Sequence, residues 1–349
     1  MREKTQFFIT LGSVLILFAG CIAYYYFNFE RLRFNMLSPK DEREFNAVIG
    51  RYFKFDSVII GTSMSENFKC SEFDKVTGGY SQKLTTSGGI ISEIAFMADY
   101  AFKHQQIKNV LLDILPYSYL SVKPEYEIDQ RVYNNSAITI HDLVNGTKLS
   151  TIVKYQKSIR NNVAKKSIDR DTIYSWSKQF PCGLKPFAIS LFAQSSALKN
   201  HGKFWKNYDR KLACSNINNY LLPMIKNHPD TIFYVYLPPC SILDLSIDPN
   251  SYKDFRNIIM DKLIPCQNVK LYDFQSAKHI TADWSNYKDV IHYSAEISSW
   301  IIRQLDKAEY RVTAGNRYNF EKRFDETVAA FDHKTALMNF ANYYNEHCK

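Results

Sequence analysis

Residues 57–65 have the sequence SVIIGTSMS, which predicts a buried strand followed by a tight turn. The apolar, β-branched run Val58-Ile59-Ile60 predicts a buried strand that stops at Gly61, and Ser63 follows two residues later. A buried strand that ends in this way places a hydroxyl on a tight turn at the edge of a sheet. Such a turn exposes the serine oxygen and leaves the next backbone N–H free to stabilise an oxyanion, so Ser63 is a candidate nucleophile.

Strand-like runs recur along the chain and alternate with helical patterns. Mainly apolar runs at residues 109–115, 231–237 and 269–274 predict three further strands. Residues 91–102 and 294–305 instead place their apolar side chains at helical spacing. Strands that alternate with amphipathic helices are typical of a parallel sheet covered on both faces, so the predicted fold class is α/β.

Composition and charge limit the classes of protein to which the chain belongs. Its 349 residues suffice for one large domain or two small ones. The net charge of +9 is spread along the chain, which suits an anionic cell surface or polymer, and no nucleic-acid motif is visible. The seven cysteines form no Cys-x-x-Cys pair, so zinc-site spacing is absent, and we expect neither a metal nor an organic cofactor.

The N-terminal segment predicts a membrane anchor. Residues 7–27 carry no charge and match the ~20 residues that a helix needs to cross a bilayer. The alternatives are lipoprotein processing at Cys21 and cleavage of a simple signal peptide. We favour an uncleaved anchor because residues 22–27 continue the apolar run, where mature lipoproteins usually become polar. Arg2 and Lys4 favour an N-terminus inside a bacterial cell and a soluble domain outside the cytoplasm.

The expected domain organisation follows from these patterns. The polar segment 117–205 interrupts the alternation of strands and helices, and we interpret it as a helical insertion above the carboxyl ends of the strands. It is either a lid or substrate platform or an elaboration of the packing. The predicted divisions are an anchor at 1–28, a linker at 29–49, an α/β domain at 50–310 and a helical tail at 311–349.

A candidate base and its orienting carboxylate lie near the last helix of the predicted α/β domain. Asp289 precedes His292 by three residues, just before the helix at 294–305. A carboxylate at this spacing can accept the imidazole Nδ1–H and leave Nε2 to face a serine on another loop. The predicted triad is therefore Ser63 as nucleophile, His292 as general base and then general acid, and Asp289 as the orienting group.

Two blocks of the sequence resemble the SGNH (GDSL-like) hydrolase superfamily. They are residues 61–65, Gly-Thr-Ser-Met-Ser, and residues 283–294, which contain the Asp289-x-x-His292 pair. The second block resembles a branch of membrane-anchored, exported bacterial proteins that includes the partner of teichoic-acid D-alanylation and the alginate O-acetylation proteins. The resemblance spans residues 50–310 and is least in the insertion.

This resemblance implies a fold, an activity and a set of partners. The fold would be a flavodoxin-like three-layer α/β/α sandwich with a mostly parallel sheet. The protein would be a membrane-anchored, extracytoplasmic serine esterase or O-acyltransferase that modifies a cell-surface polysaccharide through an acyl-enzyme on Ser63. Its partners would be the glycan or an acyl donor and a membrane-bound O-acyltransferase, with no nucleic acid.

The resemblance also implies an oxyanion hole built from backbone groups. The N–H of Ser63 or Met64 would act together with that of Gly88 or Gly89, which lie just before the predicted helix at 91–102. These donors would hold the negative charge that develops on the acyl oxygen.

Asp113 departs from the family pattern, because the third block of the family normally supplies an asparagine at this strand end as a further oxyanion donor. An ionised carboxylate cannot donate a hydrogen bond and repels an oxyanion. Asp113 is therefore structural, or protonated, or replaced in this role by another donor, and it is also a candidate substrate contact. Thr62 is a smaller departure, at a position where the family commonly has aspartate.

Further side chains are candidates for the mouth of the site. Trp284 and Tyr287 lie just before the triad pair and would either offer a sugar an aromatic face or pack the loop. Cys240 would be a second nucleophile or the disulfide partner of Cys266, and the latter suits an oxidising compartment.

A second function of another class stays open. With Asp113 in place of an oxyanion donor, the chain would be a catalytically weak or inactive glycan-binding or assembly partner of a membrane acyltransferase. The loss of one such donor costs on the order of a hundredfold or more in rate.

Overall fold

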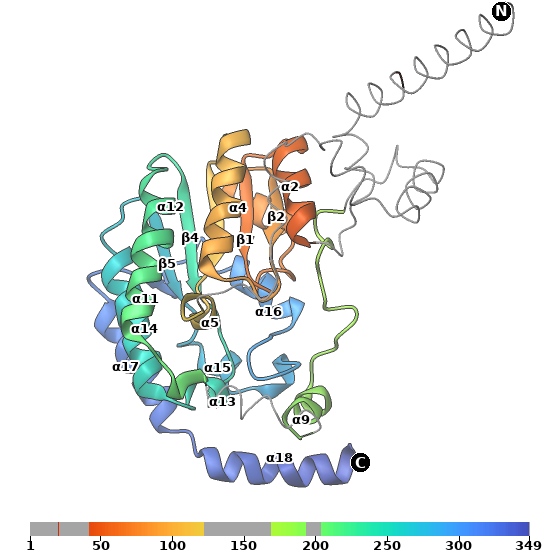
Figure 1. Cartoon of the computed structure of the whole chain (residues 1–349). Helices are drawn as coiled ribbons and strands as arrows, with labels where there is room; N and C mark the ends of the chain where they lie inside the picture. The colour runs from red at the N-terminus through yellow and green to blue at the C-terminus, as the bar shows by residue number, and fades with distance from the viewer. Residues whose placement is uncertain (1–19, 21–41, 122–168, 193–203, 349) are drawn as a thin grey trace, which may run out of the picture. The chain divides into compact units, whose positions relative to one another are not determined.

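A computed structural model describes residue 20 and residues 42–121, 169–192 and 204–348 (Figure 1). Across these residues, no helix has both the length and the apolar character needed to cross a bilayer. The predicted anchor at residues 7–27 lies outside them, apart from residue 20, and stays a prediction.

The chain divides into two units by its internal contacts. One unit comprises residues 1–48 and 128–168, of which the structure describes little beyond the start of helix α2 (Glu42–Tyr52). The other unit comprises residues 49–127 and 169–349 and contains the sheet and the candidate site.

One six-stranded sheet organises the larger unit. Its strands lie in the order β2-β1-β3-β4-β5-β6, with the first five parallel and the last antiparallel to its neighbour. The order of the first five strands is that of a flavodoxin-like, doubly wound sheet. The predicted α/β class with a mostly parallel sheet is therefore confirmed. The strands are β1 (Ser57–Gly61), β2 (Ser81–Thr85), β3 (Asn109–Asp113), β4 (Ile232–Leu237), β5 (Val269–Asp273) and β6 (Arg311–Val312).

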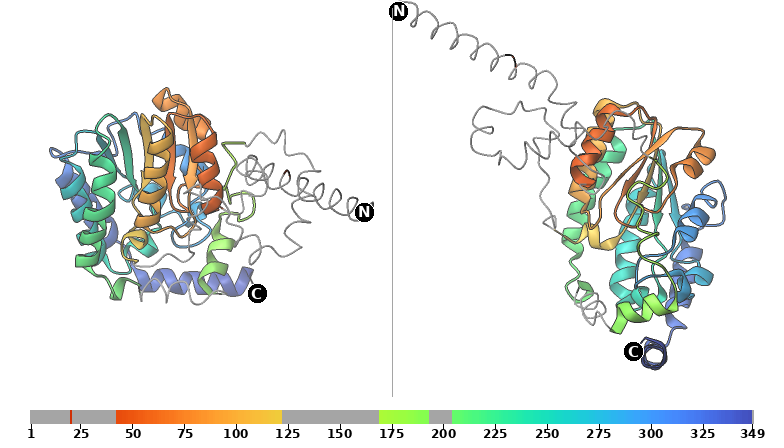
Figure 2. Two further views of the ribbon diagram at one scale, coloured as in Figure 1. Left: turned by 45° about the horizontal axis from the view of Figure 1, so that its top comes forward. Right: turned by 90° about the vertical axis from the view of Figure 1, so that its right-hand side faces the viewer.

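Helices cover both faces of this sheet (Figure 2). The chain crosses from β1 to β2 in one direction and from β2 onward in the other, and right-handed crossovers then put helices on opposite faces. Accordingly α3 packs with α16, whereas α4 packs with α12 and α11 packs with α14. Besides α2, the helices of the described residues are α3 (Cys70–Thr77), α4 (Ile91–His104), α5 (Pro116–Tyr119), α9 (Leu184–Phe192), α11 (Arg210–Asn216), the π-helix η1 (Ile217–Leu221), α12 (Leu222–Lys226), α13 (Ile242–Leu245), α14 (Pro249–Leu263), α15 (Lys278–Thr281), the 3₁₀-helix η2 (Trp284–Asn286), α16 (Ala295–Ile302), α17 (Arg317–Ala329) and α18 (His333–His347).

Strand β2 is the main difference from the expected sheet. Its residues, Ser-Gln-Lys-Leu-Thr, are all buried, although the pattern of the sequence gives little sign of a strand. The buried Lys83 ammonium donates hydrogen bonds to the carbonyl oxygens of Glu66 (2.9 Å) and Asp171 (3.0 Å). Tertiary partners thus make a polar strand compatible with the interior.

The carboxyl ends of the parallel strands meet at one edge of the sheet. The end of β1 lies beside the end of β2, where Gly61 pairs with Thr85 and the Thr86 N–H donates to the Gly61 carbonyl (2.9 Å). Asp113 at the end of β3 pairs with Tyr236 near the end of β4. The turns that follow these strands are therefore neighbours, and they build the site.

The tail beyond residue 310 combines the short edge strand β6 with α17 and α18. Helix α17 packs against α13 and α14, and α18 packs against α9. Of the predicted insertion at 117–205, residues 122–168 and 193–203 lie outside the described part of the chain, and its role as a lid stays a prediction.

Candidate active site

Ser63 lies in the turn that follows β1. The Ser65 N–H donates to the Thr62 carbonyl (2.9 Å), and the Glu66 N–H donates to the Ser63 carbonyl (3.4 Å), so the chain folds back directly after the strand. Thr62 and Met64 are buried, whereas Ser63 is partly exposed. The turn therefore presents the Ser63 side chain at the surface and anchors its two neighbours.

The buried carboxyl group of Asp113 stabilises this turn from the protein interior. Its Oδ1 accepts hydrogen bonds from the Thr62 N–H (2.8 Å) and the Ser65 hydroxyl (2.7 Å), and its Oδ2 accepts one from the Thr62 hydroxyl (2.9 Å). Burial raises the pKa of Asp113 above its ordinary value, although these hydrogen bonds act in the opposite direction. Asp113 is fully buried and occupied by the turn, so the expectation that it contacts substrate is wrong, and it has a structural position instead.

Two buried tyrosines, Tyr236 and Tyr293, add further hydrogen bonds to the turn. The hydroxyl of Tyr236 lies 3.2 Å from that of Ser65 and 3.3 Å from that of Tyr293. The Tyr293 hydroxyl in turn donates to the Met64 carbonyl (3.2 Å). Strand β4 and the start of helix α16 are thereby tied to the Ser63 turn.

His292 and Asp289 lie on the loop between η2 and α16. This loop is closed by a bridge between Tyr287 and Tyr293 and by the Lys288 N–H, which donates to the His292 carbonyl (3.1 Å). Asp289 Oδ1 accepts the His292 backbone N–H (2.9 Å), so the carboxylate also fixes the turn that carries the imidazole. This local geometry explains why the two residues need the spacing of three.

The structure brings the three predicted triad residues into one chain of hydrogen bonds. The Ser63 hydroxyl lies 2.8 Å from His292 Nε2, and His292 Nδ1 lies 2.8 Å from Asp289 Oδ2 and 2.9 Å from Oδ1. A carboxylate only accepts, so Nδ1 carries the proton and Nε2 is free to accept from Ser63. Burial works to raise the pKa of Asp289, but the charge and hydrogen bond of His292 outweigh it and lower that pKa well below its ordinary value. Their catalytic roles remain a prediction.

The predicted oxyanion donors differ in availability. The Met64 N–H donates to the Thr62 hydroxyl (3.2 Å), and the Gly89 N–H donates to the Thr86 carbonyl (3.0 Å). Among the described residues, the backbone N–H groups of Ser63 and Gly88 have no hydrogen-bond partner. Gly88 is exposed and adopts a φ of 62°, a left-handed conformation that glycine adopts without strain.

The two aromatic candidates from the preceding loop pack the interior. Tyr287 is fully buried and its hydroxyl donates to the Pro239 carbonyl (2.7 Å), so the expectation that it offers a face to substrate is wrong. Trp284 is partly buried and contacts Phe187 of α9 and Phe340 of α18, with ring centroids 6.2 and 4.2 Å away. This placement favours the alternative in which both rings pack the loop.

The cysteine hypotheses are also corrected. Cys240 and Cys266 are both free, and Cys240 is fully buried, so neither the disulfide nor an accessible second nucleophile is present. Cys240 follows the end of β4 whereas Cys266 precedes the start of the parallel β5, so the five residues of that strand separate them by on the order of 16 Å. A disulfide requires Cα atoms within about 7 Å.

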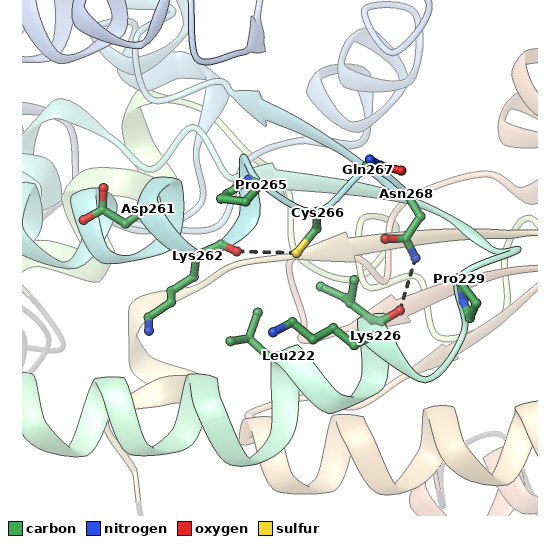
Figure 3. Close-up of a pocket in the computed structure, with 10 residues that line it drawn as sticks. Leu222, Lys226, Pro229, Asp261, Lys262, Pro265, Cys266, Gln267 and Asn268 are labelled. Carbon is green, nitrogen blue, oxygen red and sulfur yellow. Dashed lines mark hydrogen bonds between the residues drawn. The ribbon is translucent and has the colours of Figure 1, made fainter.

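Cys266 instead lines a hollow of about 530 Å³ (Figure 3). The hollow lies where β4 and β5 begin, whereas Ser63 follows the carboxyl end of β1. The Cys266 thiol donates to the Lys262 carbonyl (3.4 Å), and burial raises its pKa. Asn268 closes another side, where its amide donates to the carbonyls of Ile225 and His228. The hollow contains no member of the triad.

Trp176 joins the site without any prediction from the sequence. Its indole N–H donates to the Ser63 carbonyl (3.1 Å), and its ring meets the His292 imidazole edge to face, with centroids 5.6 Å apart. Trp176 lies within the segment predicted as an insertion, and a tryptophan between two serines in an otherwise polar segment was the available signal.

Comparisons with known proteins identify no family for this chain and only a distant structural similarity. No family model matches the chain, and no curated protein matches it significantly. A solved structure of a Streptococcus pneumonia protein, whose name refers to platelet activating factor, is similar at 9% sequence identity and a TM-score of 0.40, over 84% of this chain and 99% of that one. A similarity of this degree carries no inference about function, so the case for an activity rests on Ser63, His292 and Asp289.

Proposed function

We propose that this protein is a serine-dependent esterase or O-acyltransferase with Ser63 as its nucleophile. The observation that carries the proposal is the 2.8 Å contact between the Ser63 hydroxyl and His292 Nε2, with Asp289 on the other nitrogen of the ring. A hydroxyl is a poor nucleophile unless a positioned base removes its proton, and this arrangement supplies the base and orients it.

The reaction follows from these contacts. Ser63 Oγ attacks the acyl carbonyl carbon while its proton passes to His292 Nε2, and the ester C–O bond then breaks as His292 returns that proton to the departing alcohol. Water or a sugar hydroxyl next attacks the acyl carbon and gives its proton to His292 Nε2. The bond between the acyl carbon and Ser63 Oγ then breaks, and His292 returns the proton to Oγ, which releases the acid or the new ester. Asp289 stays ionised throughout and stabilises the imidazolium.

The backbone N–H groups of Ser63 and Gly88 are the proposed oxyanion donors. Both lack partners among the described residues, and the turn that carries Gly88 begins beside Gly61 at the end of the neighbouring strand. The N–H groups of Met64 and Gly89 are already engaged and are set aside.

The fold and the setting of the reaction are part of the proposal. The strand order and the position of Ser63 after β1 support a flavodoxin-like sandwich of the SGNH type. The apolar segment at residues 7–27 and the net charge of +9 support an anchored, extracytoplasmic enzyme that acts on a cell-surface polysaccharide beside a membrane-bound O-acyltransferase.

Active-site labelling tests the chemistry. The full chain is treated with a fluorophosphonate probe, and the adduct is located by peptide mass spectrometry. We expect it on Ser63, and we expect Ser63→Ala to abolish it. Ser276→Ala is the matched control, because that partly buried hydroxyl donates to the Asp273 carbonyl and lies outside the triad. Labelling that persists in Ser63→Ala contradicts the assignment.

One observation favours a second candidate, a weakly active or inactive glycan-binding partner of an acyltransferase. Asp113 accepts three hydrogen bonds from the turn and offers no donor to an oxyanion, so the site lacks the side-chain donor that the family normally has. A bacterial strain that carries Ser63→Ala separates the two functions. Loss of glycan modification supports the enzyme, whereas full modification supports the binding role.

A further inference from the structure

Trp176 contacts the backbone of Ser63 and the imidazole of His292, although it comes from a separate part of the chain. Its indole N–H donates to the Ser63 carbonyl, and its ring stands at 87° to the His292 imidazole. The side chain is buried. It therefore belongs to the wall of the site and is not an exposed aromatic near its mouth.

The peptide bond between Ser63 and Met64 is hydrogen-bonded at both its carbonyl and its N–H. The carbonyl of Ser63 and the N–H of Met64 belong to the same planar peptide unit. Trp176 holds the carbonyl, and the Thr62 hydroxyl accepts the N–H (3.2 Å). Hydrogen bonds at both ends restrain rotation of this peptide and so help to hold the backbone from which the Ser63 side chain projects.

The indole ring of Trp176 also restricts the orientation of the His292 imidazole. The ring of His292 is held at Nδ1 by Asp289 and meets Trp176 edge to face, which restricts the tilt of the imidazole about that hydrogen bond. The Lys288 ammonium lies 4.3 Å from the centroid of the Trp176 ring, so the indole is in turn held by a cation–π contact.

Both neighbours of Trp176 are fastened to the Ser63 turn. Asn67, a buried residue of that turn, accepts hydrogen bonds through Oδ1 from the Ser175 hydroxyl (2.9 Å) and the Ser177 N–H (3.2 Å). The position of the indole is thus fixed relative to the nucleophile by its own backbone.

We propose that Trp176 is a positioning residue that aligns Ser63 with His292. The inference rests on the proposed function, because alignment matters only if Ser63 is the nucleophile. A shift of about 1 Å in the reacting groups costs on the order of a hundredfold in rate. We therefore expect Trp176→Ala to slow acylation of Ser63 by the fluorophosphonate by roughly a hundredfold, and Trp176→Phe, which keeps an aromatic ring but loses the N–H, by roughly tenfold.

Trp205→Phe is the matched control. Trp205 is a buried tryptophan that packs against Tyr117 and Tyr252 and is not part of the site around Ser63. Trp205→Phe and Trp176→Phe remove the same volume from the interior. Circular dichroism first shows that both variants are folded. The rate of acylation of Trp205→Phe should then match that of the wild type.

Fluorescence gives a second readout that does not depend on turnover. His292→Gln removes the imidazole that meets the indole of Trp176 edge to face, so this substitution should change the tryptophan emission. The change should be absent when His292→Gln is made in Trp176→Phe, and it should persist when His292→Gln is made in Trp205→Phe.

The outcomes separate the two ideas. If the wild type forms the Ser63 adduct and folded Trp176→Phe and Trp176→Ala react at the wild-type rate, the positioning role is overturned while the proposed function stands. If the wild type forms no Ser63 adduct, both are overturned. Slower acylation of both Trp176 variants, with loss of the fluorescence change, establishes the positioning role.

Discussion

The Cα of Gly61 lies so close to the carboxyl group of Asp113 that a Cβ at residue 61 would come within 1.8 Å of Asp113 Oδ1. This approach lets the carboxyl group reach past the end of β1 and bond the Thr62 N–H. A glycine two residues before Ser63 is therefore required by the carboxyl group that holds the turn.

Replacement of Gly61 should consequently unfold the turn or displace Asp113. A Cβ would also meet Ser65 Oγ at 2.9 Å, and the φ of +151° is one that other residues rarely adopt. We expect Gly61→Ala to lower the free energy of unfolding by roughly 2 kcal/mol or more, measured by chemical denaturation. Gly315→Ala is the control, since the nearest atom to its Cβ would be 4.0 Å away, and it should be close to neutral. Equal stabilities would contradict this account of the turn.

Asp289→Asn tests the orienting carboxylate. The amide keeps an acceptor for the His292 backbone N–H, but it allows the imidazole to carry its proton on the wrong nitrogen. We expect the rate of Ser63 labelling to fall by roughly 10³–10⁴-fold while the far-UV circular dichroism is unchanged. Asp283→Asn is the control, because that exposed carboxylate caps η2 in the same region. An unchanged labelling rate in Asp289→Asn would remove Asp289 from the triad.

Lys83 predicts a pH-dependent stability. Burial lowers its pKa from 10.5 to about 8, although nearby Cys70 and Asp171 act in the opposite direction. Between pH 8 and 10.5 the unfolded chain binds more protons than the folded one, so the stability of the wild type rises with pH there. Relative to Lys83→Met, we expect a rise of up to about 1.4 kcal/mol per pH unit in the free energy of unfolding.

Lys108→Met is the matched control for that titration. Lys108 is 71% exposed and pairs with Asp56 at the surface, so its removal should leave the slope between pH 8 and 10.5 unchanged. If wild type and Lys83→Met respond to pH in parallel across this range, the buried ammonium does not titrate as described.

Cys240 and Cys266 should differ in their reactivity toward a thiol reagent. Cys240 is fully buried and its burial raises the pKa of the thiol well above the ordinary value, so we expect no reaction with a thiol reagent in the native protein. Cys266 is partly exposed in its hollow and should react slowly. Peptide mapping without reductant should show no peptide that joins them. Such a linked peptide would contradict the separation of the two strand ends.

The sequence was sufficient to predict the strands at 58–60, 109–115, 231–237 and 269–274, because each is apolar enough to be read without its neighbours. Those strands imply a parallel sheet, and the ends of parallel strands meet at one edge. This reasoning, together with the Asp289-x-x-His292 spacing and the family resemblance, predicted that Ser63 and His292 meet, and the structure places them in contact.

The differences arise where the environment of a residue depends on distant segments. Strand β2 is polar, and its burial depends on partners such as the Asp171 carbonyl, which lies 88 residues from Lys83. Tyr287 is buried because its hydroxyl reaches Pro239, and Trp176 joins the site because its segment returns to the Ser63 turn. These contacts join residues far apart in the chain, so the local sequence pattern does not predict them.

The hydrogen bond between Ser63 and His292 joins residues that are 229 positions apart. While the chain is still being synthesised, Ser63 is already present but His292 is not, so no imidazole is available to activate the hydroxyl. Under the proposed function, reaction at Ser63 therefore requires that the chain has folded from β1 through to α16. A fluorophosphonate adduct would thus count complete molecules and ignore unfinished ones.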